Sequence, residues 1–255
     1  MSAPLLALSA VTKRFGGVTA LDHVSFDLAE GELVGLIGPN GAGKTTLLNC
    51  LSRLYRLDGG SIRFSGMDIA KLGRHEVARL GVGRTFQVVR PFRSMTAREN
   101  VAIGALFGSD RARLPPREAF RVADEVIDLV GLGGRGHLLV DELTVPDRRH
   151  LEVARALATR PRLLLLDEVM AGLNPSEVAE ALEVVKRIHA SGIAILVIEH
   201  VMQVIVGICP RVVVLHFGKV LLEGDPSTVL KDPRVVEAYL GERYARRVRG
   251  SRGDG

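Results

Sequence analysis

The feature that most constrains the fold of this chain is the stretch GPNGAGKT at residues 38–45. It satisfies the pattern G-x-x-x-x-G-K-[ST], and it stands between a predicted strand at residues 32–37 and a predicted helix at residues 45–54. In that context the glycines let the backbone wrap a phosphate chain, while backbone N–H groups and the helix N-terminus attract its negative charge. A glycine-rich turn with an incidental lysine is the alternative, and the flanking strand and helix argue against it.

This loop gives its residues separate roles. The Lys44 ammonium would reach the β- and γ-phosphates of a nucleotide, and the Thr45 hydroxyl would bind Mg²⁺. The residues that we expect to contact the nucleotide here are Gly38, Pro39, Asn40, Gly41, Ala42, Gly43, Lys44, Thr45 and Thr46.

Two consecutive carboxylates follow a second apolar segment, the four leucines at residues 163–166. Because side chains alternate along a strand, Asp167 and Glu168 should point in different directions and can take different roles. We expect Asp167 to hold Mg²⁺ through water and Glu168 to polarise the attacking water. The alternative is that both are ordinary surface acids at the end of a strand, and the presence of the phosphate loop in the same chain argues against it.

Two further polar residues complete the predicted site. His200 follows a predicted strand at residues 193–198, where its imidazole would meet the γ-phosphate, and Gln87 lies where the β-rich half gives way to a helical region. The Gln87 amide would contact Mg²⁺ or water. We therefore assign catalysis to Lys44, Gln87, Glu168 and His200, and the metal to Thr45, Gln87 and Asp167. A satisfied surface or core histidine and a polar loop glutamine are the plainer interpretations.

The order of predicted elements indicates a single α/β domain over residues 1–255. Strands and helices alternate at residues 32–54 and 163–215, which is typical of a parallel sheet, and short alternating segments before residue 30 indicate an antiparallel β-layer. Helical patterning dominates from about residue 88 to 160, with a loop expected at residues 109–116. The Gly- and Arg-rich residues 244–255 are expected to be a disordered basic tail.

Composition excludes several other classes of protein. The two cysteines, Cys50 and Cys209, have no zinc-ligand spacing, and no apolar run approaches the ~20 residues of a membrane span. We expect no signal peptide and a reduced compartment. Much of the net positive charge of +5 lies near the C-terminus, with no interleaved aromatic residue beyond Tyr244, so we expect no nucleic-acid partner.

Taken in order, these segments resemble the ATP-binding subunits of ABC transporters over nearly the whole chain. The corresponding features are the adenine-stacking loop at residues 13–17 with Phe15, Walker A at 38–45, the Q-loop residue Gln87, Walker B with its catalytic glutamate at 163–168, the D-loop at 171–175 and the switch histidine His200. RTFQ at residues 84–87, IEH at 198–200 and AYLGE at 238–242 resemble the branched-chain amino acid importer ATPases in particular.

This resemblance implies an α/β fold with a P-loop NTPase core, the ABC ATPase head, carrying an N-terminal antiparallel β-layer and a helical subdomain. It implies ATP and Mg²⁺ as cofactors, and ATP hydrolysis coupled to transport. It also implies head-to-tail pairing with a second ATP-binding subunit and docking on transmembrane permease subunits, with a periplasmic or extracellular substrate-binding protein acting indirectly. The chain would lie on the cytoplasmic face of the plasma (inner) membrane as a peripheral subunit.

One segment departs from the family pattern. The signature, usually LSGGQ, aligns with LTVPD at residues 143–147. Pro146 has no N–H to donate, Val145 adds bulk, and Asp147 places negative charge near an anion, although the same residues start a helix well. We therefore expect an asymmetric heterodimer, in which a non-identical partner completes the site on this chain's phosphate loop.

Other functions remain as alternatives. A GTPase would need an N-K-x-D element, and a chromosome-maintenance ATPase would need long coiled coils; the sequence contains neither. A nucleotide-binding regulatory subunit without hydrolysis would explain the altered signature, but it would not need Lys44, Asp167, Glu168 and His200 together. A lipid or lipopolysaccharide exporter ATPase, or an importer of urea or short amides, also fits the motifs.

Overall fold

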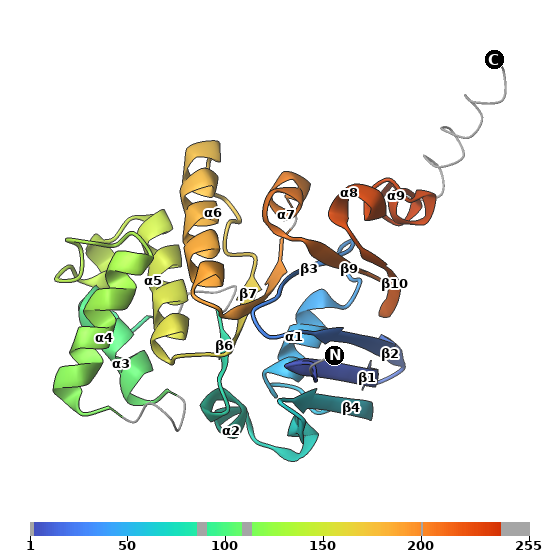
Figure 1. Ribbon diagram of the computed structural model, residues 1–255, viewed down its shortest axis with the longest axis horizontal. Coiled ribbons are helices and arrows are strands. Elements are labelled where there is room, and N and C mark those ends of the chain that lie inside the picture. The colour runs from blue at the N-terminus through green and yellow to red at the C-terminus, as the bar shows by residue number, and fades with distance from the viewer. Residues whose placement is uncertain (1–2, 86–90, 109–113, 200, 241–255) are drawn as a thin grey trace.

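The computed structural model describes residues 3–85, 91–108, 114–199 and 201–240. The first of its two sheets is an antiparallel layer near the N-terminus, in the strand order β2-β1-β4-β5 (Figure 1). Its strands are β1 (Leu6–Phe15), β2 (Val18–Leu28), β4 (Gly59–Phe64) and β5 (Met67–Asp68). The antiparallel layer expected from the sequence is confirmed.

The second sheet has the order β10-β9-β3-β8-β7-β6. Its strands are β3 (Leu33–Ile37), β6 (Val82–Arg84), β7 (Leu163–Asp167), β8 (Ala194–Ile198), β9 (Arg211–His216) and β10 (Lys219–Gly224). Neighbours are parallel except for β10, which returns antiparallel to β9 through a tight turn. The parallel arrangement expected from the alternating strands and helices holds for β3, β6, β7, β8 and β9, and β10 adds an antiparallel edge strand. The carboxyl ends of β3, β7 and β8 meet at one edge of the sheet, where ligands bind in open α/β folds.

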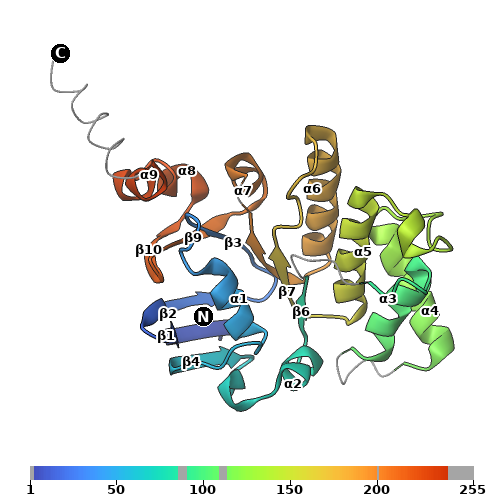
Figure 2. The same cartoon turned by 180° about the vertical axis from the view of Figure 1, so that it is seen from behind.

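The helices fall into two groups. In the first, α1 (Lys44–Leu51), α2 (Arg74–Arg79), α6 (Pro175–Ala190), α7 (Met202–Ile208), α8 (Pro226–Val229) and α9 (Pro233–Leu240) accompany the sheets, with a short 3-10 turn at Ile69–Lys71. In the second, α3 (Ala97–Leu106), α4 (Pro116–Leu129) and α5 (Val145–Ala158) pack on one another. A 3-10 turn at Val140–Glu142 lies before α5. Both ribbon views place this second group at one end of the molecule and α9 at the other (Figures 1 and 2).

The expected loop at residues 109–116 is shorter at its C-terminal side. Pro116 is the first residue of α4 and Pro115 is its N-cap, because a proline ring suits the first helical turn, where no N–H partner is needed. Residues 109–113 lie outside the described part of the chain. Within that described part, no helix has the length and apolarity of a bilayer span.

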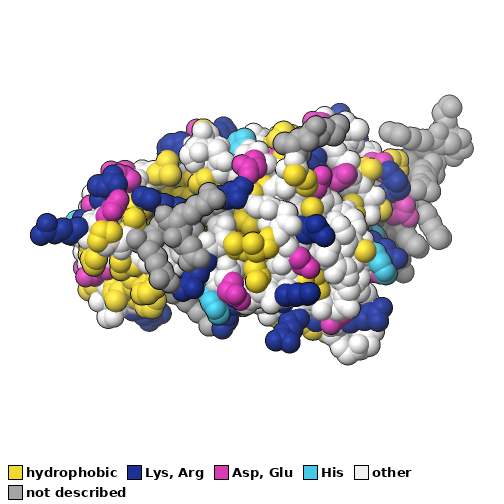
Figure 3. Space-filling model, turned by 60° about the horizontal axis from the view of Figure 1, so that its bottom comes forward, with side chains coloured by type: hydrophobic (Ala, Val, Ile, Leu, Met, Phe, Trp, Pro, Cys, Tyr) yellow, Lys and Arg dark blue, Asp and Glu magenta, His cyan; other side chains and the backbone are white. Residues whose placement is uncertain are grey.

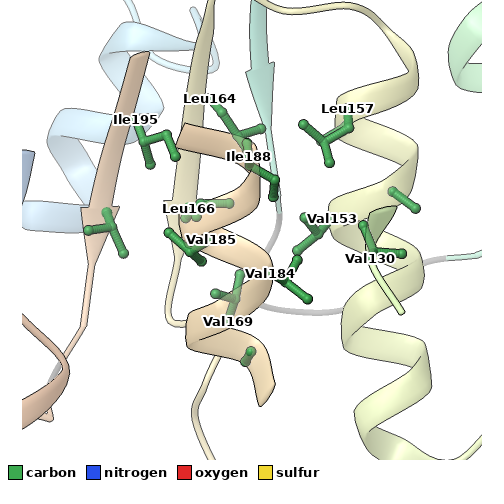
Figure 4. Close-up of a cluster of buried hydrophobic side chains, with 14 of the residues drawn as sticks. Val130, Val153, Leu157, Leu164, Leu166, Val169, Val184, Val185, Ile188 and Ile195 are labelled. Carbon is green, nitrogen blue, oxygen red and sulfur yellow. The ribbon is translucent and has the colours of Figure 1, made fainter. Parts of the chain in front are cut away.

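Strand β7 shows how the core is organised. Its leucines alternate between two buried clusters: Leu163 and Leu165 join the cluster under the antiparallel layer, whereas Leu164 and Leu166 join the cluster that reaches α5 and α6. Figure 4 shows Leu164 and Leu166 among side chains of α5 and α6, including Val153 and Val185. Each buried leucine contributes roughly 1.5–3 kcal/mol of transfer free energy, so β7 is firmly placed and fixes the position of Asp167 at its end.

Basic side chains are dispersed on the face that Figure 3 shows. Lys and Arg lie among acidic and hydrophobic side chains there rather than in one continuous patch. The positive charge of the sequence is therefore not concentrated on this face.

Candidate nucleotide-binding and hydrolysis site

The phosphate loop lies between β3 and α1, and two of its glycines are required by their surroundings. Gly38 has φ 148° and a Cβ there would lie 2.1 Å from the Leu215 carbonyl oxygen. Gly43, the N-cap of α1, has φ 106° and a Cβ would lie 2.6 Å from the Ala20 carbonyl oxygen. These left-handed conformations exclude other residues. Since Gly43 offers no side-chain cap, the first N–H groups of α1 are not used by a capping side chain.

Lys44 ties the loop together from inside. Its Nζ donates hydrogen bonds to the carbonyl oxygens of Gly38, at 2.6 Å, and Pro39, at 3.0 Å. Burial lowers the pKa of Lys44, while Glu168 and Asp167 act in the opposite direction. The positive charge of Lys44 is thus held within the loop, facing two carboxylates.

The two carboxylates after β7 occupy different places. Glu168 lines a pocket of about 190 Å³ together with residues of the phosphate loop, Lys44 and Thr45 among them. Its φ is 52°, and its N–H donates to the Ile198 carbonyl oxygen at 3.0 Å. A glutamate in a left-handed conformation carries a strain of about 1–3 kcal/mol, which occurs at functional sites when the surrounding structure imposes it.

Asp167 is buried and paired. Its Oδ2 accepts a hydrogen bond from the Arg84 guanidinium at 3.1 Å, and both side chains are almost inaccessible to solvent. Burial raises the pKa of Asp167, an effect that the positive charge of Arg84 opposes. Among the described residues, Asp167 Oδ1 has no hydrogen-bond partner. A buried carboxylate oxygen of this kind is suited to a water bound to a cation.

Phe15 contacts Tyr55 and Lys13, and Asp58 holds the neighbouring residues; the sequence interpretation gave Tyr55 and Asp58 no role in the site. Its ring packs edge-on against Tyr55 at 5.2 Å between centroids, and Lys13 Nζ lies 5.2 Å from the Phe15 centroid. Asp58 accepts hydrogen bonds from the Arg14 N–H at 2.6 Å and from Lys13 Nζ at 3.3 Å. The backbone N–H of Arg14, followed by Lys13, lowers the pKa of Asp58. The turn at Asp58 therefore anchors the segment that presents a half-exposed Phe15 ring.

Comparison with known proteins identifies the family. The ABC transporter model matches residues 21–171, and the model of the branched-chain amino acid ATP-binding cassette transporters matches residues 219–245. The chain belongs to the ABC transporter ATPases. It therefore binds and hydrolyses ATP, and the α/β fold expected from the sequence is confirmed.

Several individual proteins are similar to this ABC ATPase. It is 39% identical to the high-affinity branched-chain amino acid transport ATP-binding protein BraF of Pseudomonas aeruginosa, over 95% of this chain and 100% of BraF. It is 40% identical to LivG of Salmonella typhimurium, a protein with the same description, over the same shares. The lipopolysaccharide export system ATP-binding protein LptB of Acidithiobacillus ferridurans is 37% identical, over 94% of this chain and 98% of LptB.

A solved structure of an ABC transporter cassette has the same fold. The ATP-binding cassette MJ1267 in its ADP conformation superposes with a TM-score of 0.86 at 30% identity, covering 94% of this chain and 100% of that one. The likeness thus extends over both sheets and the helical group.

Two expected site residues of this ABC ATPase lie outside the described residues, namely Gln87 and His200. Their neighbours are described. Thr85 Oγ1 accepts a hydrogen bond from the Asp167 N–H at 3.1 Å, which joins the segment before Gln87 to the end of β7. Glu199, which is buried, accepts one from the Met170 N–H at 3.0 Å. Neither partner could be read from the sequence, because both contacts join residues far apart along the chain.

The altered signature segment forms a complete helix start. Thr144 is the N-cap of α5: its Oγ1 accepts from the Asp147 N–H at 3.3 Å, and Asp147 Oδ2 accepts from the Thr144 N–H at 3.2 Å. Asp147 is also ion-paired with Arg135. The ion pair with Arg135 offsets part of the negative charge that Asp147 brings to this segment. Pro146 lies in the first turn of α5, where it has no N–H to donate, and the Val145 side chain is exposed.

Proposed function

We propose that this chain is the ATP-hydrolysing subunit of an importer for branched-chain amino acids or related small polar solutes. The observation that carries the proposal is the pocket in which Glu168 faces the phosphate loop and Lys44. The substrate class rests on the relatives BraF and LivG and on the matching C-terminal segment at residues 219–245.

The residues near this pocket fit Mg²⁺. The Thr45 hydroxyl and the Asp167 carboxylate supply hard oxygen donors, and the buried Asp167 Oδ1 has no partner among the described residues. Gln87 would complete the set as a third oxygen donor. When bound, the cation would neutralise charge on the β- and γ-phosphates of ATP.

The protein's own residues divide the catalytic work. Glu168 orients and polarises the attacking water, and Lys44 turns its ammonium from the Gly38 carbonyl to the phosphates. His200 would contact the γ-phosphate, and Gln87 would contact the water or the metal. Phe15 stacks on the adenine, because its ring is half-exposed at the end of β1. Positioning and charge stabilisation of this kind account for most of the catalysis of phosphoryl transfer.

A non-identical ATP-binding partner would complete this site. Pro146 removes a backbone donor from the signature segment of this chain, and Thr144 engages another donor in its cap. The partner would supply an intact signature to this chain's phosphate loop, whereas this chain's own segment would serve the reciprocal site poorly. ATPase turnover should therefore rise when the chain is mixed with an ATP-binding subunit that co-purifies with it from membranes.

Transmembrane permease subunits would dock at a cavity of about 940 Å³ between α2, β6 and the pair α3 and α5. Phe107 lies on its wall with 78% of its surface exposed, and Leu54 adds a second exposed apolar side chain. The chain would thereby be held peripherally on the cytoplasmic face of the inner membrane, with the substrate-binding protein on the other side. Phe107→Glu should abolish co-purification with the permease and leave ATP binding intact.

The enzymatic assignment is tested by Glu168→Gln. This variant should bind Mg·ATP as tightly as the unaltered chain in calorimetry but hydrolyse it at least about 100-fold more slowly, because the amide cannot polarise water. An unchanged rate of hydrolysis would reject the catalytic role of Glu168. Since LptB is also similar, lipopolysaccharide-export components among the co-purifying proteins would instead favour the exporter alternative.

A further inference from the structure

Arg84, the last residue of β6, is bound by two separate elements of the nucleotide site. Its side chain is only 7% exposed. One terminal nitrogen donates to Asp167 Oδ2 at 3.1 Å, at the end of β7. The other donates to Asn49 Oδ1 at 2.7 Å and to Ser52 Oγ at 2.8 Å, both on the C-terminal side of α1. The guanidinium therefore bridges the helix that starts at the phosphate loop and the strand that ends in the carboxylate.

The planar guanidinium fixes direction as well as charge. Its nitrogens donate at set angles, so the anchors on α1 determine where the bond to Asp167 can lie. This bond engages only Oδ2 and leaves Oδ1 buried without a partner among the residues described. The backbone beneath is held independently, because the Asp167 N–H donates to Thr85 Oγ1. Arg84 therefore acts on the side chain of Asp167, whereas Thr85 holds its backbone.

We propose that Arg84 is a positioning residue for ATP hydrolysis: anchored on Asn49 and Ser52, it holds the Asp167 carboxylate so that Oδ1 faces the water shell of Mg²⁺. The proposal rests on the Mg²⁺ site of the proposed function. Residues that orient a metal-binding carboxylate commonly change metal affinity by about 10- to 100-fold when removed. A merely structural ion pair would alter stability and leave the metal dependence of ATP binding as it was.

The test uses the full chain with Glu168→Gln, which prevents turnover, and compares ATP affinity in Mg²⁺ with that in EDTA. Adding Arg84→Gln should reduce the gain in affinity due to Mg²⁺ by about 10-fold or more, while the affinity in EDTA stays within about twofold. Arg84→Lys should give a gain between those of Arg84 and Arg84→Gln, because lysine keeps the positive charge but lacks the planar set of donors. Asn49→Ala keeps both Arg84 and Asp167 and should reduce the gain in ATP affinity due to Mg²⁺ by about threefold. If Arg84→Gln fails to fold, the result for Asn49→Ala tests the proposal instead.

Arg211→Gln is the matched control. Arg211 is also a partly buried arginine that bridges elements, with Nε donating to Glu32 Oε1 at 2.7 Å, but its hydrogen bonds within the described part of the chain go to Glu32, Asp27 and Glu223 and not to Asp167 or α1. It should destabilise the fold without changing the gain due to Mg²⁺. An equal gain with and without Arg84 would overturn the proposal. If the Glu168→Gln chain itself shows no gain from Mg²⁺, the metal site of the proposed function fails, and the role of Arg84 fails with it.

Discussion

The starts of helices α1 and α5 are built differently. The first lies in the Walker A segment and the second in the segment that aligns with the ABC signature. At α1, a glycine loop in left-handed conformations precedes the helix, and no side chain caps it. At α5, Thr144 and Asp147 form a reciprocal capping box, with Pro146 in the first turn. The first arrangement leaves backbone N–H groups for an anion, whereas the second uses or removes them.

Helix stability and anion binding thus compete for the same backbone N–H donors. A side-chain cap is worth about 0.5–2 kcal/mol of stability, and it takes an N–H group that a phosphate would otherwise accept from. The α1 start gives up this stabilisation, and the chain offsets it with buried packing of α1 against the core. The α5 start keeps it. Mutations at the start of α1 should therefore reduce mainly ATP affinity, whereas mutations at the start of α5 should reduce mainly the stability of the fold.

The largest effect is expected at the phosphate loop. Gly38→Ala places a Cβ against the Leu215 carbonyl oxygen, so the loop must shift, and ATP affinity should fall at least about 100-fold. Gly41→Ala is the control, because a Cβ there meets nothing within 4 Å and only the left-handed φ of 78° opposes it. Titration calorimetry should give a far lower ATP affinity for Gly38→Ala than for Gly41→Ala. Equal losses would mean that backbone strain, not the contact with Leu215, decides.

A smaller effect, on stability instead of binding, is expected at α5. Thr144→Ala removes the side-chain acceptor for the Asp147 N–H and should lower the free energy of unfolding by about 0.5–2 kcal/mol. ATP affinity at the chain's own loop should not change. Urea unfolding and calorimetry on the same sample measure both quantities. Asn174→Ala, at the capped start of α6, should cost about the same stability. A loss of ATP affinity in Thr144→Ala alone would show that the two helix starts are coupled.

The smallest effect is expected at Asp58, which anchors the segment that carries Phe15. Asp58→Asn loses the ion pair with Lys13 and should weaken ATP binding about threefold. Because the pKa of Asp58 is lowered in the folded chain, its contribution is present above the ordinary aspartate pKa of about 3.9 and is lost only as the pH falls through the lowered value. The difference between Asp58→Asn and the unaltered chain should therefore be constant from pH 6 to 8. A difference that varies in this range would exclude Asp58 as its source.

Local patterns predicted the elements that bear the chemistry. The phosphate loop, the leucine strand before Asp167 and the capped start of α6 were placed within a few residues, because each has a strong signal in contiguous residues. Strand β10 was missed, since it is only half buried and lacks a clear alternation. Its pairing with β9 makes the sheet mixed.

The partners of the site residues could not be predicted in this way. Arg84 and Asp167 are 83 residues apart, and Arg135 meets Asp147 only because the turn before α5 folds back. Such pairs depend on tertiary packing, which periodicity and motifs do not encode. The sequence therefore identified candidate groups for the chemistry but not the residues that orient them or balance their charge.

We expect this chain to carry one competent half of an ATP site, at its phosphate loop, and one incompetent half, at its signature segment. The most direct test measures ATPase turnover of the purified chain alone, before and after the signature is rebuilt with Thr144→Ser, Val145→Gly, Pro146→Gly and Asp147→Gln. We expect slow turnover by the unaltered chain and an increase of at least about 10-fold in the rebuilt one, since a regained hydrogen bond to phosphate is worth about 1.5–3 kcal/mol. Rapid turnover by the unaltered chain alone, with no increase on rebuilding, would contradict the claim.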